Sequence, residues 1–349
     1  MSRRVKVAVA LSGGVDSSTA VALLLDQGYD VFGVTMEVVP DATDQTTARA
    51  AAATAEHFGI PHYVFDFRET FAQRIIAPFV ETYQRGETPN PCVLCNPRIK
   101  FGVLLEAALG LGADYLATGH YVRVERLGER FVLRRGADTR KDQSYVLYSL
   151  RQEQLAHVMF PLGGYTKQQI RQLARQYGLP SAEKSESQEI CFIAGDYRDF
   201  LCSYLAQPPQ PGNIVDVEGR VLGQHQGLPW YTIGQRKGLG IAAGTPLYVV
   251  DLNPERNEVV VGPKEAALGQ SLVAEEVNLI SIPYLEEPLE VMAKIRYNAG
   301  AAKARIEPLP SGEVRTVFEE PQFAITPGQA VVWYQDDLVV GGGRIRKRA

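Results

Sequence analysis

Cysteine is scarce in this sequence, with four residues among 349, and long apolar runs are lacking altogether. Four cysteines in a chain of this size favour thiol chemistry or metal ligation over a disulfide scaffold. No stretch approaches the roughly 20 apolar residues of a membrane span. The chain begins Met1-Ser2-Arg3-Arg4 and enters a strand pattern at once, without the apolar segment of a secretory signal. We therefore expect a cytoplasmic protein without a membrane partner.

The sequence also has little net charge. Its 36 Lys and Arg residues stand against 40 Asp and Glu residues, which gives a formal charge of −4. This balance excludes a general electrostatic attraction to nucleic acid, so any such site must be a local patch. The length of the chain allows two or three domains, each with its own core.

The most informative stretch is the glycine-rich run Ser12-Gly13-Gly14-Val15-Asp16-Ser17-Ser18. It follows a strand pattern over Val5–Leu11 and opens a helical pattern over Ser17–Leu25. Two glycines let the backbone approach a ligand closely, and the first N–H groups of a helix have no partners within it. The run therefore predicts a phosphate-binding loop. The alternative is a tight turn in which Asp16 or Ser17 caps the helix.

The run is neither a Walker A motif, since no lysine follows it, nor a G-x-G-x-x-G motif. It resembles the SGGxDS loop of the PP-loop ATP pyrophosphatases, which cleave ATP between the α and β phosphates and adenylate an oxygen atom. The resemblance implies that ATP is held by the loop and by Met36 and Gly119 at the ends of two further strands. Met36 could instead be a core residue. The implied ATP-binding residues are Ala10, Leu11, Ser12, Gly13, Gly14, Val15, Asp16, Ser17, Met36 and Gly119.

Strands and helices alternate through the first 206 residues, which predicts an α/β fold with a Rossmann-like parallel sheet. The run Gln207-Pro208-Pro209-Gln210-Pro211-Gly212 reads as a linker. Beyond it the sequence consists of short alternating strands and glycine turns. We expect a central β-rich module over 207–270 and a small β-barrel over 271–349.

A proline-rich segment, 87–101, holds the pair Cys92-Val93-Leu94-Cys95. We expect its prolines to exclude a regular element and to present both thiols on a stiff loop. A third thiol, Cys191, follows in a strand-like context, and Cys202 is expected to pack inside a helix. A zinc site would need four ligands, and a thioredoxin-like pair would lie at a helix start. Catalytic thiol chemistry and a 4Fe-4S cluster ligated by Cys92, Cys95 and Cys191 both remain open.

The most basic window of the chain is 121–141, with seven basic and three acidic residues in a hairpin-like pattern. It leads into the polar cluster Lys141-Asp142-Gln143-Ser144-Tyr145, which precedes a helix-like run over 146–150. Lysine, glutamine and tyrosine together suit contacts with the phosphates and bases of a folded RNA. A solvated face is the alternative.

Eight blocks spread along nearly the whole chain resemble those of the bacterial tRNA-specific 2-thiouridylases: SGGVDSS, TPNPCVLCNPRIKFG, ATGHYVR, KDQSYVLY, ESQEICFI, GQRKGLG, KIRYNAG and PGQAVVWY. The resemblance implies that ATP and Mg²⁺ activate the C2 oxygen of the wobble uridine, U34, in the tRNAs for Lys, Glu and Gln, and that sulfur replaces it. Asn90, Pro91 and Cys92 would hold the target base. The implied tRNA contacts are His120, Lys141, Asp142, Gln143, Arg296, Tyr297 and Gln329.

The same resemblance assigns the thiols. Cys191 would receive a persulfide sulfur from an upstream sulfur-carrier protein or cysteine desulfurase, and Cys95 would be the nucleophile that releases it. Alternatively, the sulfur attacks C2 directly. Many members have aspartate where this chain has Cys92. This difference leaves the general base unassigned and keeps the cluster route beside the persulfide route. An NAD or GMP synthetase on the same fold, and an iron-sulfur RNA-binding protein with a structural loop, are the rival interpretations.

Overall fold

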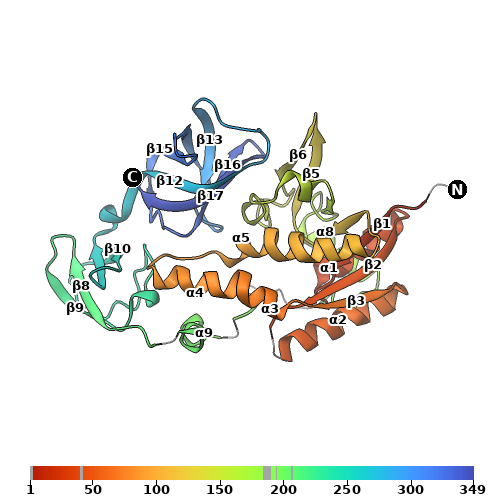
Figure 1. Cartoon of the computed structure of the whole chain (residues 1–349), viewed down its shortest axis with the longest axis horizontal. Coiled ribbons are helices and arrows are strands. Elements are labelled where there is room, and N and C mark those ends of the chain that lie inside the picture. Colours follow the sequence, from red (N-terminus) through yellow and green to blue (C-terminus); the bar gives the residue numbers. More distant parts are fainter. Residues whose placement is uncertain (1–2, 40–41, 184–189, 194, 206) are drawn as a thin grey trace. The chain divides into compact units, whose positions relative to one another are not determined.

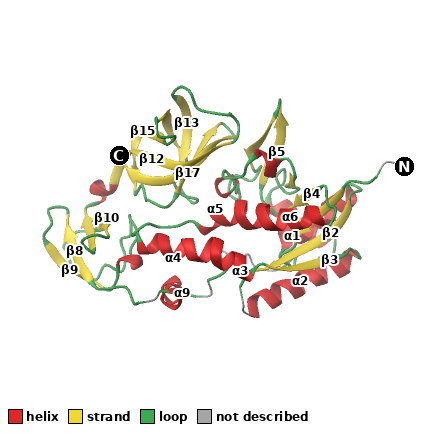
Figure 2. Ribbon diagram, viewed as in Figure 1, coloured by secondary structure: helices red, strands yellow, loops and turns green. Residues whose placement is uncertain are grey.

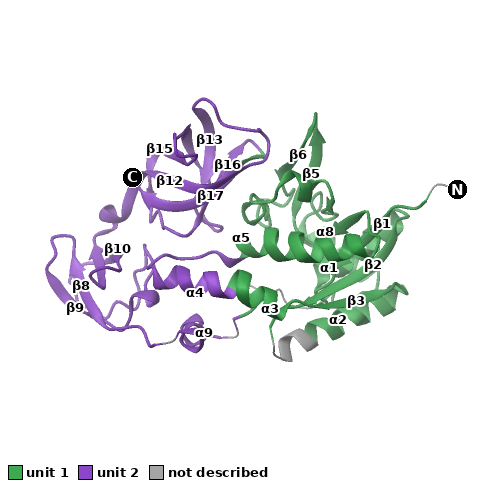
Figure 3. Cartoon of the chain, in the orientation of Figure 1, with its two compact units in different colours: residues 1–75, 92–192, 337–340 green, residues 76–91, 193–336, 341–349 purple. Residues whose placement is uncertain are grey.

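The computed structural model describes residues 3–39, 42–183, 190–193, 195–205 and 207–349. The chain forms two compact units (Figure 3). The first unit combines Met1–Ile75, Cys92–Phe192 and Asp337–Val340; the second combines Ile76–Pro91, Ile193–Asp336 and Gly341–Ala349. Each unit thus contains segments that are distant in the sequence. The linear domain boundaries expected after residues 206 and 270 stay a prediction.

A five-stranded parallel sheet organises the first unit, as predicted. Its strands follow the order β3-β2-β1-β4-β7, with β1 at Lys6–Ala10, β2 at Asp30–Glu37, β3 at His62–Asp66, β4 at Tyr115–Ala117 and β7 at Val158–Met159. In the register of β1, Val7 faces Val31 of β2 and Tyr115 of β4. Because these pairings are parallel, the carboxyl ends of β1, β2 and β4 lie at one edge of the sheet; β1 and β2 are labelled in Figure 1.

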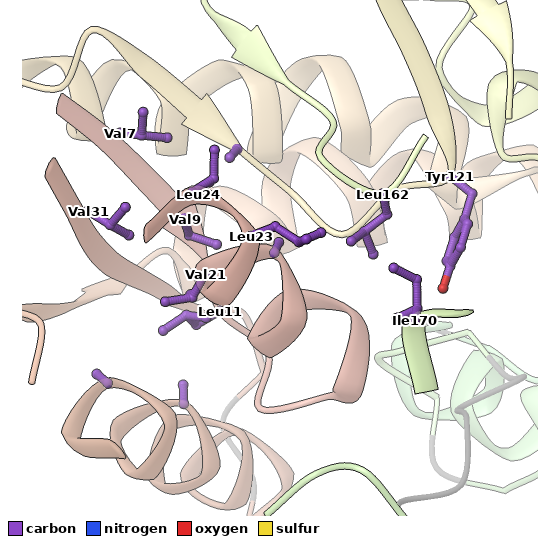
Figure 4. Packing of buried hydrophobic residues seen from close by; sticks show 14 residues of the cluster. Val7, Val9, Leu11, Val21, Leu23, Leu24, Val31, Tyr121, Leu162 and Ile170 are labelled. Atoms are coloured by element: carbon purple, nitrogen blue, oxygen red, sulfur yellow. The ribbon is translucent and has the colours of Figure 1, made fainter. Parts of the chain in front are cut away.

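Helices follow the strands in the order that the sequence pattern predicts (Figure 2). The principal ones are α1 (Val15–Asp26), α2 (Ala42–Phe58), α6 (Leu104–Gly110) and α8 (Lys167–Gln176), with a short α3 (Arg68–Phe71) and α7 (Gln152–Leu155). Apolar side chains of β1, β2 and α1 form one buried cluster (Figure 4). Burying each Val or Leu side chain contributes about 1.5–3 kcal/mol, so this cluster holds α1 on the sheet.

The predicted hairpin is β5 (Val122–Leu127) and β6 (Arg130–Arg135). Arg123 and Arg134 of the hairpin bind Asp337 at 2.7 and 2.6 Å. Two of the seven basic side chains of the window 121–141 therefore share one carboxylate within the unit.

The expectation that prolines exclude a regular element from 87–101 was wrong. Pro91–Cys95 forms α5, and Asn96–Val103 continues it as a π-helix, η2. Pro91 is the first helical residue, where a missing N–H removes no helical bond. Pro97 lies in the first turn of η2, and Gly102 departs from helical geometry with φ −102° and ψ −107°. A Cβ atom at Gly102 would lie 2.8 Å from the Pro97 carbonyl oxygen, so the wide turn requires glycine there.

Three further local expectations were wrong. The run 146–150 is not an α-helix: Val146 ends the short 3₁₀ helix η3 (Ser144–Val146), and turns follow it. Cys191 lies in a turn rather than a strand. Cys202 on α9 (Tyr197–Tyr204) is exposed rather than packed. Residues 184–189, which precede Cys191 in its sequence block, lie outside the described residues.

The second unit begins at Ile76, the last residue of the π-helix η1 (Ala72–Ile76), and continues with α4 at Ala77–Gln84. Its smaller sheet has the order β10-β11-β8-β9 and is mixed, since β11 and β8 are parallel. The strands are β8 (Gly212–Asp216), β9 (Val221–His225), β10 (Tyr248–Asn253) and β11 (Glu258–Gly262), with 3₁₀ turns η4 at Leu228–Trp230 and η5 at Lys264–Ala267. Ile214, Val249 and Val259 form its buried core.

The last part of the chain is the predicted β-barrel. Six antiparallel strands follow the order β12-β15-β14-β13-β16-β17, and β12 pairs with β17 to close the ring. They are β12 (Leu268–Leu279), β13 (Leu289–Lys294), β14 (Ala302–Pro308), β15 (Val314–Phe323), β16 (Ala330–Gln335) and β17 (Leu338–Arg348). Trp333 is fully buried, and its indole N–H donates to Thr316 Oγ1 at 3.0 Å. Among the described residues, no helix is both long and apolar enough to cross a membrane.

Candidate nucleotide-binding and thiol site

The loop between β1 and α1 has the geometry of an anion cradle. Gly13 adopts φ +66°, and a Cβ atom there would lie 2.3 Å from the Cβ of Ala50, so only glycine fits. Gly14 is the N-cap residue of α1 and makes no side-chain capping bond. The first-turn N–H groups of α1 therefore keep their capacity to bind an oxyanion, which the helix dipole also favours.

Serine and threonine hydroxyls hold the backbone of this loop. Ser17 Oγ accepts from the N–H of Ser12 at 3.2 Å and donates to the Gly14 carbonyl at 3.2 Å. Thr35 Oγ1 on β2 donates to the Leu11 carbonyl at 2.9 Å. Ser17 thus stabilises the loop itself. It does not cap α1, as the alternative interpretation of the motif as a tight turn would require.

Gly119 brings a second strand end against the loop. A Cβ atom at Gly119 would lie 2.9 Å from Asp16 Cβ and 3.0 Å from the backbone N of Ser17. This close approach explains a glycine just after β4. Met36 is half-buried near the end of β2, at the same carboxyl edge of the parallel sheet. Ligands of open α/β sheets bind at this edge.

The structure adds two residues that the sequence did not indicate, Lys167 and Tyr121. Lys167 Nζ donates to both carboxylate oxygens of Asp16, at 2.8 and 2.7 Å. The hydroxyl of Tyr121 donates to Asp16 Oδ1 at 2.7 Å. The lysine is almost buried, whereas Asp16 remains partly exposed at the loop. The cation that the loop lacks in sequence is therefore supplied by the start of α8.

The three thiols of interest belong to the first unit and differ in exposure. Cys92 and Cys191 are exposed, whereas the Cys95 side chain is buried. Burial raises the pKa of the Cys95 thiol to about 12, and the nearby Cys191 and Cys92 raise it further while Lys100 opposes them. Cys95 is consequently a protonated thiol at neutral pH. It must be uncovered before it can act as a nucleophile.

The donor groups fit a magnesium ion better than an iron-sulfur cluster. Mg²⁺ commonly uses one or two carboxylates together with phosphate oxygens and water, and the partly exposed Asp16 carboxylate can serve as one ligand. A 4Fe-4S cluster needs thiolates. Across the described ranges, no group of three or more His, Cys, Asp or Glu residues is arranged to hold a metal ion. Cys92, Cys95 and Cys191 therefore do not fit a cluster in this conformation.

The expected target-base residues Asn90 and Pro91 follow a segment anchored to the barrel. Pro91 is buried and Asn90 half-buried. The Gln329 side-chain amide donates to the carbonyl oxygens of Thr88 and Pro89, at 2.9 and 3.2 Å. Gln329 was expected to contact tRNA, and here its amide N–H groups bind the protein backbone.

Two of the expected tRNA residues, Asp142 and Gln143, are used inside the fold. Asp142 is buried and accepts from the N–H groups of Gly136 and Ser144, both at 3.1 Å, and from the Ser144 hydroxyl at 2.9 Å. Gln143 Oε1 accepts from the N–H of Tyr121 at 2.9 Å. These bonds shape the segment 136–144 and leave the half-buried Lys141 at its surface.

His120 is buried between Phe101 and Phe160 and shares a 2.7 Å hydrogen bond with Thr118. Burial, with the charge of Lys100 as a smaller cause, holds the pKa of His120 well below its usual value. It is a neutral imidazole in an aromatic pocket at neutral pH.

Arg296 and Tyr297, in the second unit, differ from each other. Arg296 Nη2 donates to the carbonyl oxygens of Ile233 and Ala324 and to Thr326 Oγ1, at 2.7 to 3.0 Å. Tyr297 is exposed, and Lys294 Nζ lies 5.5 Å from its ring centroid. An exposed aromatic ring beside a lysine suits stacking on a base.

Family models match almost the entire chain in three consecutive parts. Residues 5–195 match a tRNA methyl transferase HUP domain, residues 198–263 a tRNA methyl transferase PRC-barrel domain, and residues 269–345 an aminomethyltransferase beta-barrel domain. Among solved structures, the U34-tRNA thiolase NcsA from Methanococcus maripaludis with its [4Fe-4S] cluster aligns with a TM-score of 0.37 and 19% identity, over 58% of this chain and 65% of that one. A similarity at that level supports no functional argument.

Two relatives are far more similar. The tRNA-specific 2-thiouridylase MnmA of Carboxydothermus hydrogenoformans is 51% identical over 360 residues, which cover 99% of this chain and 98% of the relative. The protein of the same name from Moorella thermoacetica is 52% identical over 354 residues, covering 98% and 99%. Identity of this extent over whole chains means that the chain belongs to the tRNA-specific 2-thiouridylases, a family of sulfurtransferases.

Proposed function

We propose that this chain catalyses the ATP-dependent 2-thiolation of the wobble uridine, U34, in the tRNAs for Lys, Glu and Gln. The observation that carries the proposal is the presence of an anion cradle at Gly13 and Gly14 in the same unit as Cys95 and Cys191. Family membership supports it, since relatives about half identical over their full length bear the name tRNA-specific 2-thiouridylase. The family model for residues 5–195 is described as a tRNA methyl transferase domain. We give that description less weight than the names of the two relatives, which match over the full length of the chain.

In the first step, the C2 oxygen of the uridine attacks the α-phosphorus of ATP, an O–P bond forms, and pyrophosphate leaves. The first-turn N–H groups of α1 and the dipole of that helix would stabilise the negative charge on the departing pyrophosphate. Mg²⁺, when bound, would neutralise phosphate charge as a Lewis acid. The product is an O-adenylated base from which AMP departs far more readily than an oxide ion.

In the second step, sulfur arrives as a persulfide on Cys191, supplied by an upstream sulfur-carrier protein or cysteine desulfurase. The Cys95 thiolate attacks the Cys191 Sγ atom and displaces hydrosulfide, leaving a Cys95–Cys191 disulfide. Hydrosulfide adds to C2, and AMP is expelled. A thiol reductant then restores both cysteines. Because burial raises the pKa of Cys95, this route requires the thiol to be uncovered first.

The cluster route is the alternative, and it would require Cys92, Cys95 and Cys191 to rearrange, because in this conformation they are not placed to hold a metal ion. An absorption spectrum of anaerobically purified protein distinguishes the two routes. A broad band near about 400 nm would favour a cluster. Its absence in an active preparation would favour the persulfide.

Thiolation is tested with unmodified tRNA, ATP, Mg²⁺ and a sulfur source, by mass spectrometry of 2-thiouridine and by pyrophosphate release. We expect both products from the wild type. Cys95→Ser and Cys191→Ser should each lose more than about a hundredfold in thiolation, whereas Cys202→Ser, an exposed thiol on α9, should stay within about twofold. Retention of full activity in Cys95→Ser and Cys191→Ser would favour a synthetase of the same fold.

If tRNA and ATP gave no pyrophosphate, the result would favour an RNA-binding protein with a structural loop.

We further propose residues 1–206 as the catalytic domain, 207–270 as a central module and 271–349 as the C-terminal barrel. The linker at 207–212 supports the first boundary. We propose the cytoplasm as the place of the reaction, since its reducing conditions keep such thiols available.

A further inference from the structure

The Asp16 carboxylate lies on the phosphate loop, yet both of its side-chain partners come from elsewhere in the first unit. Tyr121 donates to Asp16 from the turn before β5, and Lys167 donates from the first residue of α8. Each of these two partners is also bound, through its backbone, to the segment 136–144. The nucleotide loop is therefore linked by two routes to the segment that contains Lys141.

The first route runs through Tyr121. Its hydroxyl donates to Asp16 Oδ1 at 2.7 Å. Its backbone N–H donates to Gln143 Oε1 at 2.9 Å, and its carbonyl oxygen accepts from the N–H of Gln143 at 3.0 Å. A displacement of the tyrosine side chain by the loop would thus act directly on Gln143.

The second route runs through Lys167. Its ammonium group binds both oxygens of Asp16, and its backbone N–H donates to Asp138 Oδ2 at 3.1 Å. Asp138 Oδ1 accepts from the N–H of Arg140 at 3.1 Å, and the Asp138 carbonyl accepts from the N–H of Lys141 at 3.0 Å. The hydrogen bond from the backbone N–H of Lys167 is the largest cause that lowers the pKa of Asp138, so the Asp138 carboxylate is ionised at neutral pH.

A bound triphosphate must alter the environment of Asp16. The carboxylate lies in the first turn of the helix whose N–H groups form the cradle, so phosphate and carboxylate are like charges at short range. The phosphates attract the Lys167 ammonium and repel the Asp16 carboxylate, and a Mg²⁺ ion held by Asp16 would compete with Lys167 for the same oxygens. Either Lys167 stays on Asp16 and neutralises its charge more closely, or the Lys167 side chain shifts toward the phosphates. In both cases the bonds that Lys167 and Tyr121 share with Asp16 change.

We infer that Tyr121 and Lys167, through their shared bonds to Asp16, couple nucleotide binding at the loop to the conformation of the segment 138–143 and so to tRNA binding. The inference rests on the proposed function, because it takes this segment to be a tRNA contact. Tyr121 and Lys167 are positioning residues in this scheme. Linkage requires the coupling to be reciprocal: tRNA must strengthen nucleotide binding by the factor by which the nucleotide strengthens tRNA binding.

The test measures the dissociation constant of α,β-methylene-ATP, which cannot be cleaved at the α–β bridge, with and without a saturating unmodified tRNA transcript. In the wild type we expect tRNA to lower this constant by about fivefold or more. In Tyr121→Phe, which removes the hydroxyl and keeps the ring, we expect a factor below about two. Tyr115→Phe on β4 removes the same group away from both routes and should couple like the wild type.

Hydrogen–deuterium exchange on the wild type provides a second reading that needs no variant. We expect α,β-methylene-ATP alone to slow amide exchange in peptides covering 138–143. Unchanged exchange there, or full coupling in Tyr121→Phe, would overturn the inference. So would equal nucleotide affinity with and without tRNA in a wild type that still makes 2-thiouridine. Failure to make 2-thiouridine at all would instead count against the proposed function.

Discussion

Gln329 on the barrel holds the backbone of Thr88, with its amide nitrogen 2.9 Å from the Thr88 carbonyl oxygen and 3.2 Å from that of Pro89. The same segment is bound at two further points. The N–H of Thr88 donates to the Pro327 carbonyl at 2.9 Å, and Arg344 pairs with Glu87 at 2.8 Å. The backbone just before the expected target-base residues Asn90 and Pro91 is therefore held in place by these contacts.

This anchor predicts the behaviour of Gln329→Leu, which removes both amide donors. We expect the free energy of unfolding to fall by about 1–2 kcal/mol and the single-turnover rate of thiolation by about tenfold. The tRNA dissociation constant should change by less than about twofold, because the amide positions the protein backbone.

Gln270→Leu is the matched control, since Gln270 also donates its amide to a carbonyl of the barrel, that of Phe318 at 3.3 Å. It should leave the thiolation rate unchanged. A large loss of tRNA affinity in Gln329→Leu, with the rate at saturating tRNA preserved, would instead identify a direct tRNA contact.

Burial of Cys95 predicts a wide range of thiol reactivities. At pH 8, iodoacetamide should label Cys92, Cys191 and Cys202 rapidly and Cys95 more than about a hundredfold more slowly, because the pKa of Cys95 is raised to about 12. Peptide mapping by mass spectrometry of timed samples measures each rate. Labelling of Cys95 as fast as that of Cys202 would contradict the buried thiol.

The same shift predicts an effect of pH on stability. Burial raises the pKa of the Cys95 thiol above the ordinary value of 9.0, so the folded chain keeps a proton that the unfolded chain has lost. The contribution of this group is fully present below pH 9 and decreases as the pH rises toward 12. Urea unfolding at several pH values should show a smaller decline in Cys95→Ala than in the wild type over that range. Parallel declines would show that the thiol is ionised in the folded chain.

Gly119→Ala should weaken nucleotide binding by more than about tenfold without unfolding the protein. Its Cβ atom would lie 2.9 Å from Asp16 Cβ and 3.0 Å from the Ser17 nitrogen, so the start of α1 would have to move. Gly110→Ala at the end of α6 is the control, since nothing lies within 4 Å of its Cβ position. Calorimetric titration with α,β-methylene-ATP compares the two, and equal affinities would remove Gly119 from the site.

Neighbouring residues of the polar cluster should respond differently to substitution. Asp142→Ala removes a buried acceptor of three hydrogen bonds and should lower the free energy of unfolding by about 2–3 kcal/mol. Lys141→Gln should leave that energy almost unchanged. It should weaken tRNA binding and reduce the salt dependence of the affinity by about one phosphate contact. Chemical unfolding and filter binding at several salt concentrations measure both, and an unchanged salt slope would exclude a phosphate contact by Lys141.

Much of the fold could be predicted from local patterns. The alternation of strands and helices before residue 206 predicted the parallel sheet, and the glycine turns after it predicted the β-rich part. Thr166 predicted the start of α8, and the structure contains the capping bond from Gln169 to its hydroxyl. These features depend on residues within one or two turns of each other, and such spacings are visible in a sequence.

Where distant segments meet, local patterns were insufficient. The prolines of 87–101 predicted an irregular loop, but Pro91 begins a helix and the carbonyl of Pro97 accepts a 2.8 Å bond from Gln154, 57 positions away. Asp142 and Gln143 were predicted to contact tRNA, but in the structure their side chains accept hydrogen bonds that shape the turn from 136 to 144. The partners of Pro97 and Gln143 lie 57 and 22 positions away, whereas Asp142 is bound within its own turn, by Gly136 and Ser144.

By itself, the sequence determined the glycine-rich loop before α1, the order of strands and helices, and the three thiols, because glycine, apolar periodicity and cysteine have strong local effects. Only the tertiary structure decided that Asp16 is neutralised by a lysine 151 positions away and that Cys95 is buried. An ion pair and a raised pKa depend on distance and on exclusion of water. Both are properties of the folded packing, and spacing along the chain does not encode them.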